Sequence, residues 1–129
     1  MNLVPWPTRL IVGTAAGVFA YGTGAHVVQL LVGGLNPYPA MPRWLAIYFV
    51  SLTVLDALAV VLLWRRPVLG LVLGCVILAT DAAANGYANY VVDDSPGVTA
   101  GRIGQALITL LALALVALTP RTVRALRHL

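Results

Sequence analysis

The chain of 129 residues is 60% hydrophobic and 9% charged, with a formal net charge of +4 and a mean hydropathy of +0.93. This balance excludes a soluble domain of ordinary composition, because about 25% of the residues in such domains are charged. The composition indicates an integral membrane protein.

Four apolar segments are long enough, at about 1.5 Å per helical residue, to cross a hydrocarbon core roughly 30 Å thick. The sequence therefore predicts an all-α fold, an integral membrane four-helix bundle that forms a single transmembrane domain over residues 1–129. The predicted helices cover residues about 9–32, 44–64, 68–91 and 103–118.

Prolines and tryptophans mark the predicted helix ends. The first helix follows VPWP, where Pro5 and Pro7 resist helix formation and Trp6 suits the headgroup region. It ends at the loop GGLNPYPAMPR. The second helix has a tryptophan at each end, Trp44 and Trp64, and the turn RRP leads into the third. The polar loop VDDSPGVTAGR separates the third helix from the fourth.

The arginines predict the orientation of the bundle, since basic residues flanking membrane helices tend to stay in the cytoplasm. With four spans both termini share one side. That side carries six arginines: Arg9, Arg65, Arg66, Arg121, Arg124 and Arg127. The other side carries Arg43 and Arg102, so we expect both termini to be cytoplasmic. All eight basic residues are arginine, which suggests a GC-rich bacterial genome and hence the bacterial inner (plasma) membrane.

One histidine and two aspartates lie inside the predicted spans and are the catalytic candidates. His26, Asp56 and Asp81 lie about 10, 20 and 15 Å below the outer surface, respectively, counted at ~1.5 Å per helical residue. An ionisable side chain at the bilayer centre costs about 2.5–3.5 kcal/mol, so such residues usually face the bundle interior and serve a function. Three helices thus send ionisable groups to overlapping depths, which predicts a shared pocket with acid–base chemistry.

Several uncharged polar residues accompany them. In TDAAANGYAN, Asp81, Asn85 and Asn89 follow one another at intervals of four residues and share one helix face. Such amides either contact a ligand or only join neighbouring helices by hydrogen bonds. The candidate ligand-binding residues are Gln29, Asn85, Asn89, Gln105 and Tyr87.

Other features predict packing rather than chemistry. The small residues of GTAAG and GLVLG allow helices to approach closely, within the chain or in a homodimer. Cys75 is the only cysteine, and no metal or cofactor motif is present, so we expect neither a metal nor a cofactor. The basic C-terminal RTVRALRH is interpreted as an orientation signal, and no nucleic-acid partner is expected.

Local motifs resemble the EXPERA superfamily, which includes the emopamil-binding sterol isomerase and the sigma-two receptor. The matching stretches are GAHVVQ, SLTVLDALAVVLL and the RRP turn leading into LGLVLGCVILATDAAANGY, within about residues 20–92. The resemblance implies that His26, Asp56 and Asp81 are pocket residues that move a proton on and off a lipophilic substrate. The chain differs in having only Gln29 near the position of the isomerase's second acid and no Trp in IGQALITLLALALVAL.

Three functions are therefore compatible with the sequence. The first is binding of a lipophilic, sterol- or isoprenoid-like small molecule, either neutral or cationic, with or without proton-transfer isomerisation. The second is a small transporter or proton pathway that uses a His/Asp relay. The third is a membrane scaffold or accessory subunit in which the polar residues only set helix register.

Overall fold

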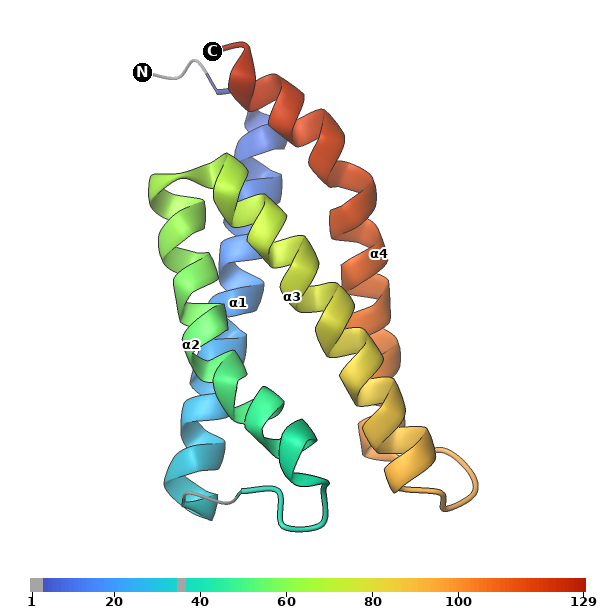
Figure 1. Ribbon diagram of the computed structural model, residues 1–129. Coiled ribbons are helices and arrows are strands. Elements are labelled where there is room, and N and C mark those ends of the chain that lie inside the picture. The colour runs from blue at the N-terminus through green and yellow to red at the C-terminus, as the bar shows by residue number, and fades with distance from the viewer. Residues whose placement is uncertain (1–3, 35–36) are drawn as a thin grey trace.

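The computed structural model describes residues 4–34 and 37–129, and it confirms an all-α architecture with four helices. Each helix is long and apolar enough to cross a membrane. The first helix begins and the fourth helix ends at the same end of the bundle (Figure 1). The elements in chain order are α1 (Trp6–Gly33), α2 (Arg43–Arg65), α3 (Pro67–Tyr87), its π-helical continuation η1 (Ala88–Val92) and α4 (Ala100–Arg127).

The N-terminal prolines do not delay α1 as the sequence suggested. The helix begins at Trp6, so Pro7 lies in its first turn and Pro5 is the N-cap. The first N–H groups of a helix have no intrahelical acceptor, so a proline without an N–H costs nothing there.

α4 continues nine residues beyond the predicted end at residue 118. Pro120 lies inside the helix, and α4 bends along its upper half in Figure 1, as expected where a proline removes a backbone hydrogen bond. Thr122 is buried, and its hydroxyl donates to the Leu118 carbonyl at 2.8 Å. The arginines of RTVRALRH therefore lie on a packed helix rather than on a free tail.

The bundle consists of two helical hairpins, α1 with α2 and α3 with α4, joined at Arg66 (Figure 1). α3 lies close against α2 at Gly70, where an added Cβ would lie 2.5 Å from the backbone nitrogen of Leu63. Gly74, which also lies in α3, packs against the ring of Phe19 of α1. Glycine thus permits the close backbone contact that the GLVLG pattern predicts.

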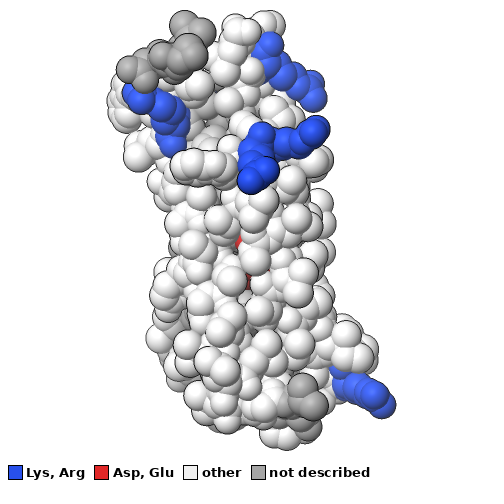
Figure 2. All heavy atoms as spheres, turned by 90° about the vertical axis from the view of Figure 1, so that its left-hand side faces the viewer, with Lys and Arg blue, Asp and Glu red and all other residues white. Residues whose placement is uncertain are grey.

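The surface is divided by charge. Arginine side chains lie toward the two ends of the face in Figure 2, with most of them at one end, and almost only uncharged residues cover the length between. Large apolar side chains such as Val54, Leu110 and Leu113 are 63–70% exposed on the helices. Such surface is suited to lipid, which supports a multi-pass integral membrane protein.

The loop between α3 and α4 is held by Arg102. Its Nε donates to the Asn89 carbonyl at 2.8 Å, its Nη1 to the Gly97 carbonyl at 2.6 Å and its Nη2 to the Asp93 carbonyl at 3.0 Å. The guanidinium also lies 4.8 Å from the centre of the Tyr90 ring. Arg102 therefore has a structural role in addition to its charge.

We expect Arg102→Lys to loosen this loop, because a single ammonium group cannot reproduce the fork of guanidinium donors. Amide exchange within residues 93–99 should accelerate about tenfold, which corresponds to a local loss of roughly 1.4 kcal/mol. Arg43→Lys is the matched control, since Arg43 is exposed at the same end of the bundle. Equal exchange in the two variants would show that the three carbonyl contacts do not hold the loop.

Candidate functional site

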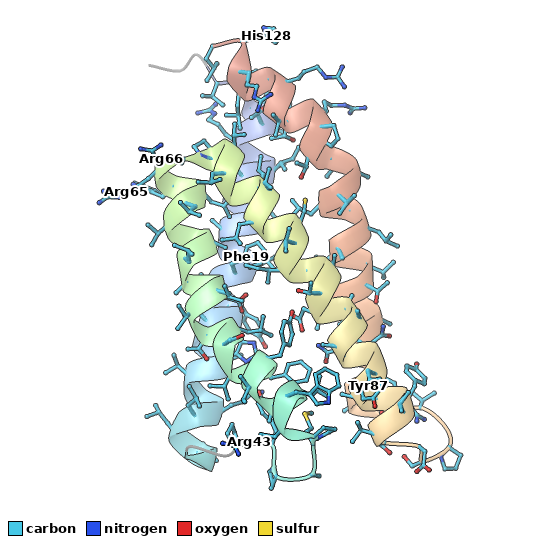
Figure 3. The ribbon with its side chains drawn as sticks, viewed as in Figure 1. Phe19, Arg43, Arg65, Arg66, Tyr87 and His128 are labelled. Atoms are coloured by element: carbon cyan, nitrogen blue, oxygen red, sulfur yellow. The ribbon has the colours of Figure 1, made fainter. Side chains whose placement is uncertain are left out.

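A polar cavity of about 220 Å³ lies between the helices toward the end that carries the α1–α2 and α3–α4 loops. Figure 3 shows ring side chains occupying the space between α2 and α3 near Arg43 and Tyr87. All four helices and the α1–α2 loop contribute to the lining, which consists of His26, Gln29, Tyr38, Met41, Phe49, Asp81, Asn85 and Ile108.

His26 connects the cavity to a buried carboxylate. Its Nε2 lies 3.7 Å from Oδ2 of Asp56, and its Nδ1 lies 3.1 Å from Oε1 of Gln29. An amide oxygen can only accept, so with this orientation of Gln29 the Nδ1 carries a proton. A neutral ring then turns the lone pair of Nε2 toward Asp56. The lone pair of Nε2 and the carboxylate oxygen Oδ2 would repel each other without a proton between them. One proton, on Nε2 or on Oδ2, removes that repulsion, so the pair is suited to hold a transferable proton.

Asp56 is buried because of its position on α2. It lies on the same face as Leu52, Ala59 and Leu63, which form the packed stripe of that helix. Gly22 of α1 provides the space, since an added Cβ there would lie 2.5 Å from the Asp56 Oδ2. Asp56 does not line the cavity, but it lies beside His26, which does. Figure 2 shows acidic atoms set back in a narrow opening at mid-height.

Asp81 lines the cavity directly and is oriented by its own helix. The Asn85 side chain donates to the Asp81 Oδ1 at 2.6 Å and to the Asp81 carbonyl at 3.0 Å. The Asn89 side chain donates in turn to the Asn85 carbonyl at 2.9 Å. Among the described residues, the Asp81 Oδ2 accepts no hydrogen bond, so it is available to a molecule in the cavity.

The α1–α2 loop covers the cavity with an aromatic residue that the sequence did not single out. The Tyr38 hydroxyl donates to the same Gln29 oxygen that His26 contacts. Its ring centre lies 5.5 Å from that of Phe49, a second lining residue. Burial and the nearby Asp81 carboxylate raise the pKa of Tyr38 above its ordinary value, which keeps its hydroxyl a donor. Tyr38 therefore fixes the orientation of the Gln29 amide.

A second hydrogen-bonded pair joins α2 to α3 near these groups. The hydroxyl oxygens of Tyr48 and Thr80 are 2.6 Å apart, and Thr80 directly precedes Asp81. The Tyr48 ring packs edge-on against Phe49 at 5.6 Å. The sequence contained a signal for Phe49, which lies two helical turns before Asp56 on one face of α2, but none for the loop residue Tyr38.

Three of the predicted ligand-binding residues do not line the cavity. The Gln105 amide donates to the Thr109 hydroxyl at 3.0 Å, one turn along α4. Tyr87 is 40% exposed, and its ring centre lies 5.5 Å from that of Trp44. Asn89 lies one turn beyond Asn85 and accepts from Arg102 through its carbonyl. Gln29 and Asn85, in contrast, both line the cavity.

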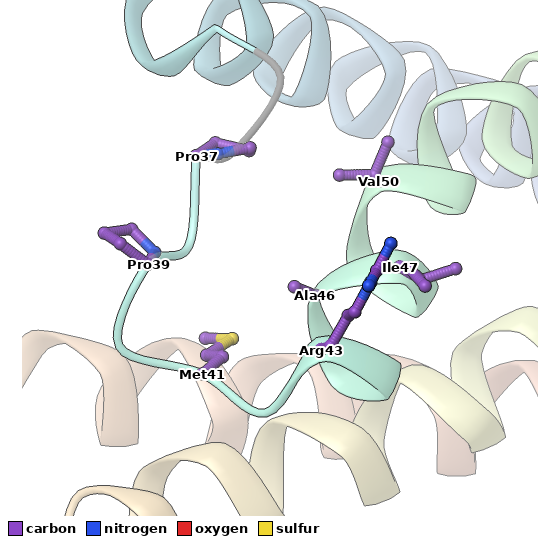
Figure 4. A pocket seen from close by; sticks show the side chains of 7 residues that line it. All are labelled: Pro37, Pro39, Met41, Arg43, Ala46, Ile47 and Val50. Carbon is purple, nitrogen blue, oxygen red and sulfur yellow. The ribbon is translucent and has the colours of Figure 1, made fainter.

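A larger hollow of about 530 Å³ adjoins the α1–α2 loop (Figure 4). Pro37 and Pro39 lie on one side of it, and Arg43, Ile47 and Val50 of α2 lie on the other. Met41 lines both this hollow and the polar cavity. A flexible, unbranched side chain is therefore the shared wall between the two spaces.

The donor set of the cavity consists of imidazole, carboxylate and amide groups. Within residues 4–34 and 37–129, no three His, Cys, Asp or Glu side chains lie close enough to hold a metal ion. The chemistry that this arrangement offers is proton transfer by the His26–Asp56 pair and charge pairing or proton uptake by Asp81. Comparisons with protein-family models, curated proteins and solved structures gave no match to this chain.

Proposed function

We propose that this chain is an integral protein of the bacterial inner membrane, with cytoplasmic termini, that binds a lipophilic small molecule in the polar cavity. The observation that carries the proposal is the convergence of His26 of α1 and Asp81 of α3 on one cavity, with Asp56 of α2 behind His26. Ionisable groups inside membrane helices are costly, and a bundle has no structural need to bring three of them together.

The ligand class follows from the lining. Apolar and aromatic side chains, Phe49, Met41 and Ile108, provide contacts for a hydrocarbon body. The Asp81 carboxylate provides a partner for positive charge. We therefore propose a sterol- or isoprenoid-like molecule that is cationic or becomes cationic during reaction.

The proposed reaction is a double-bond isomerisation. The His26–Asp56 pair donates its proton to one alkene carbon, which leaves a carbocation on the neighbouring carbon. Asp81 stabilises that positive charge and then accepts a proton from the adjacent carbon, so the double bond forms one position along. The proton returns from Asp81 to the pair with His26 as relay, and no net atom is gained or lost. A lipophilic ammonium ion would bind as a mimic of the carbocation.

Deuterium incorporation tests the catalytic part of this proposal. The purified protein in D₂O should convert an isoprenoid or sterol alkene from a test panel into a shifted isomer that carries one deuterium. His26→Ala should lower the rate at least about 100-fold, the usual scale for a general acid. Asn89→Ala is the control, since Asn89 does not line the cavity. Isomerisation that survives in His26→Ala would contradict the assigned role.

A further inference from the structure

A separate hollow of about 660 Å³ lies at the end of the bundle where α1 begins and α4 ends. α1 and α2 form most of it, with Pro67 at the start of α3 and Leu126 near the end of α4. Its walls are almost entirely apolar, and two arginines line it, Arg9 of α1 and Arg65 of α2. We call this space the terminal groove. It shares no lining residue with the polar cavity.

The charge of the terminal groove is not balanced within the chain. The sequence contains four acidic side chains: Asp56, Asp81, Asp93 and Asp94. The first two belong to the polar site, and the other two lie in the loop at the opposite end. Within the described part of the chain, neither Arg9 nor Arg65 forms an ion pair. A partner that neutralises these arginines must therefore supply its own negative charge.

The position of the groove suits a lipid. Trp64, which lines it, is 88% exposed and lies at a helix end, as tryptophans at the membrane–water interface do. From Arg9 the groove follows α1 past Gly13 to Ala16, a rise of about 10 Å toward the membrane interior. An added Cβ at Gly13 would meet no atom within 4 Å, so the groove is open at that point. Figure 2 shows arginine side chains gathered at this end of the bundle.

We propose that the terminal groove binds an anionic phospholipid. The phosphate lies between Arg9 and Arg65, where guanidinium groups can donate paired hydrogen bonds to its oxygens. One acyl chain follows the apolar wall past Gly13 and Ala16. Basic pockets between membrane helices are known to hold anionic headgroups in this way. The site is independent of the polar cavity and of any reaction there.

Native mass spectrometry of protein released from nanodiscs of equal phosphatidylglycerol and phosphatidylcholine tests this site. The wild type should retain one phosphatidylglycerol with at least a tenfold preference. The double variant Arg9→Gln/Arg65→Gln should lose that preference. The matched double variant Arg124→Gln/Arg127→Gln removes two charges from the same end of the chain but none from the groove, and it should keep the preference.

A second pair of variants tests the acyl-chain path with all arginines intact. Gly13→Leu should fill the groove and reduce retained phosphatidylglycerol at least fivefold, whereas Gly24→Leu, on the exposed far end of the same helix, should not. Equal retention of the two lipids by the wild type would overturn the proposal. An equal fall in both arginine double variants would also overturn it, because diffuse surface charge would then explain binding. An unchanged amount of retained phosphatidylglycerol in Gly13→Leu would rule out this groove.

Discussion

We expect Asp81→Asn to weaken binding of a lipophilic amine, such as a tritiated farnesyl dimethylamine, by at least about 30-fold. Removing one partner of a desolvated charge pair costs roughly 2–5 kcal/mol, and each 1.4 kcal/mol is a factor of ten in affinity. The substitution keeps the side-chain size, and its amide oxygen can still accept the hydrogen bond that Asn85 donates at 2.6 Å. The loss should therefore reflect charge rather than unfolding.

Gln105→Ala is the control for this experiment. Gln105 is a polar residue of the neighbouring helix, but it does not line the cavity and its amide bonds Thr109. Its removal should leave amine binding within about twofold of the wild type, because the Gln105 side chain makes no contact with the ligand. The hydrogen bond that is lost lies within α4 and is worth only about 0.5–1.5 kcal/mol of stability. Equal losses in both variants would mean that the amine does not bind at the Asp81 carboxylate.

The largest expected effect on stability is at Gly70. Gly70→Ala should lower the free energy of unfolding by about 1–3 kcal/mol or more, the usual range for overpacking a core. The new Cβ would lie 2.5 Å from the backbone nitrogen of Leu63 and 2.7 Å from its Cα, so the helix backbones must separate. A flexible side chain could move aside, whereas this backbone is fixed in α2.

Gly17→Ala provides the comparison, because an added Cβ at Gly17 meets nothing within 4 Å. A free helical position should gain up to about 0.5–1 kcal/mol from the better helix propensity of alanine. Unfolding of both variants in the same mixed micelles, followed by circular dichroism, gives the difference. If Gly70→Ala unfolded at the same denaturant concentration as Gly17→Ala, the backbones of α2 and α3 would not be in close contact at Gly70.

The helices could be predicted because membrane solvent imposes a simple rule on sequence. Each span must be apolar for about 20 residues, and such segments can be recognised from the hydropathy of the sequence. Their ends were less accessible. Pro7 was interpreted as opposing a helix that in fact begins one residue earlier, and the helical pattern beyond Pro120 was not recognised. Both helices tolerate a proline that lacks an N–H. Pro7 lies in the first turn of α1, where no intrahelical acceptor is available, and α4 bends near Pro120.

The candidate site was only partly accessible from sequence. The cost of burying charge drew attention to His26, Asp56 and Asp81 without showing which groups share a space. Their pairing depends on the rotation and crossing of α1 and α2, which place Asp56 behind His26 rather than in the cavity. The Asn stripe of α3 drifts around the helix and then enters a π-helical turn, so Asn85 lines the cavity and Asn89 does not.

The most direct test is to identify the small molecules that leave the native membrane bound to this protein. Native mass spectrometry of wild-type protein, followed by release and fragmentation of the adducts, should show one lipophilic molecule other than a phospholipid per chain. The adduct should be absent from both His26→Ala and Asp81→Asn, because both residues line the cavity. A wild type that carries only phospholipid, or variants that keep the same adduct, would contradict a ligand site between α1 and α3.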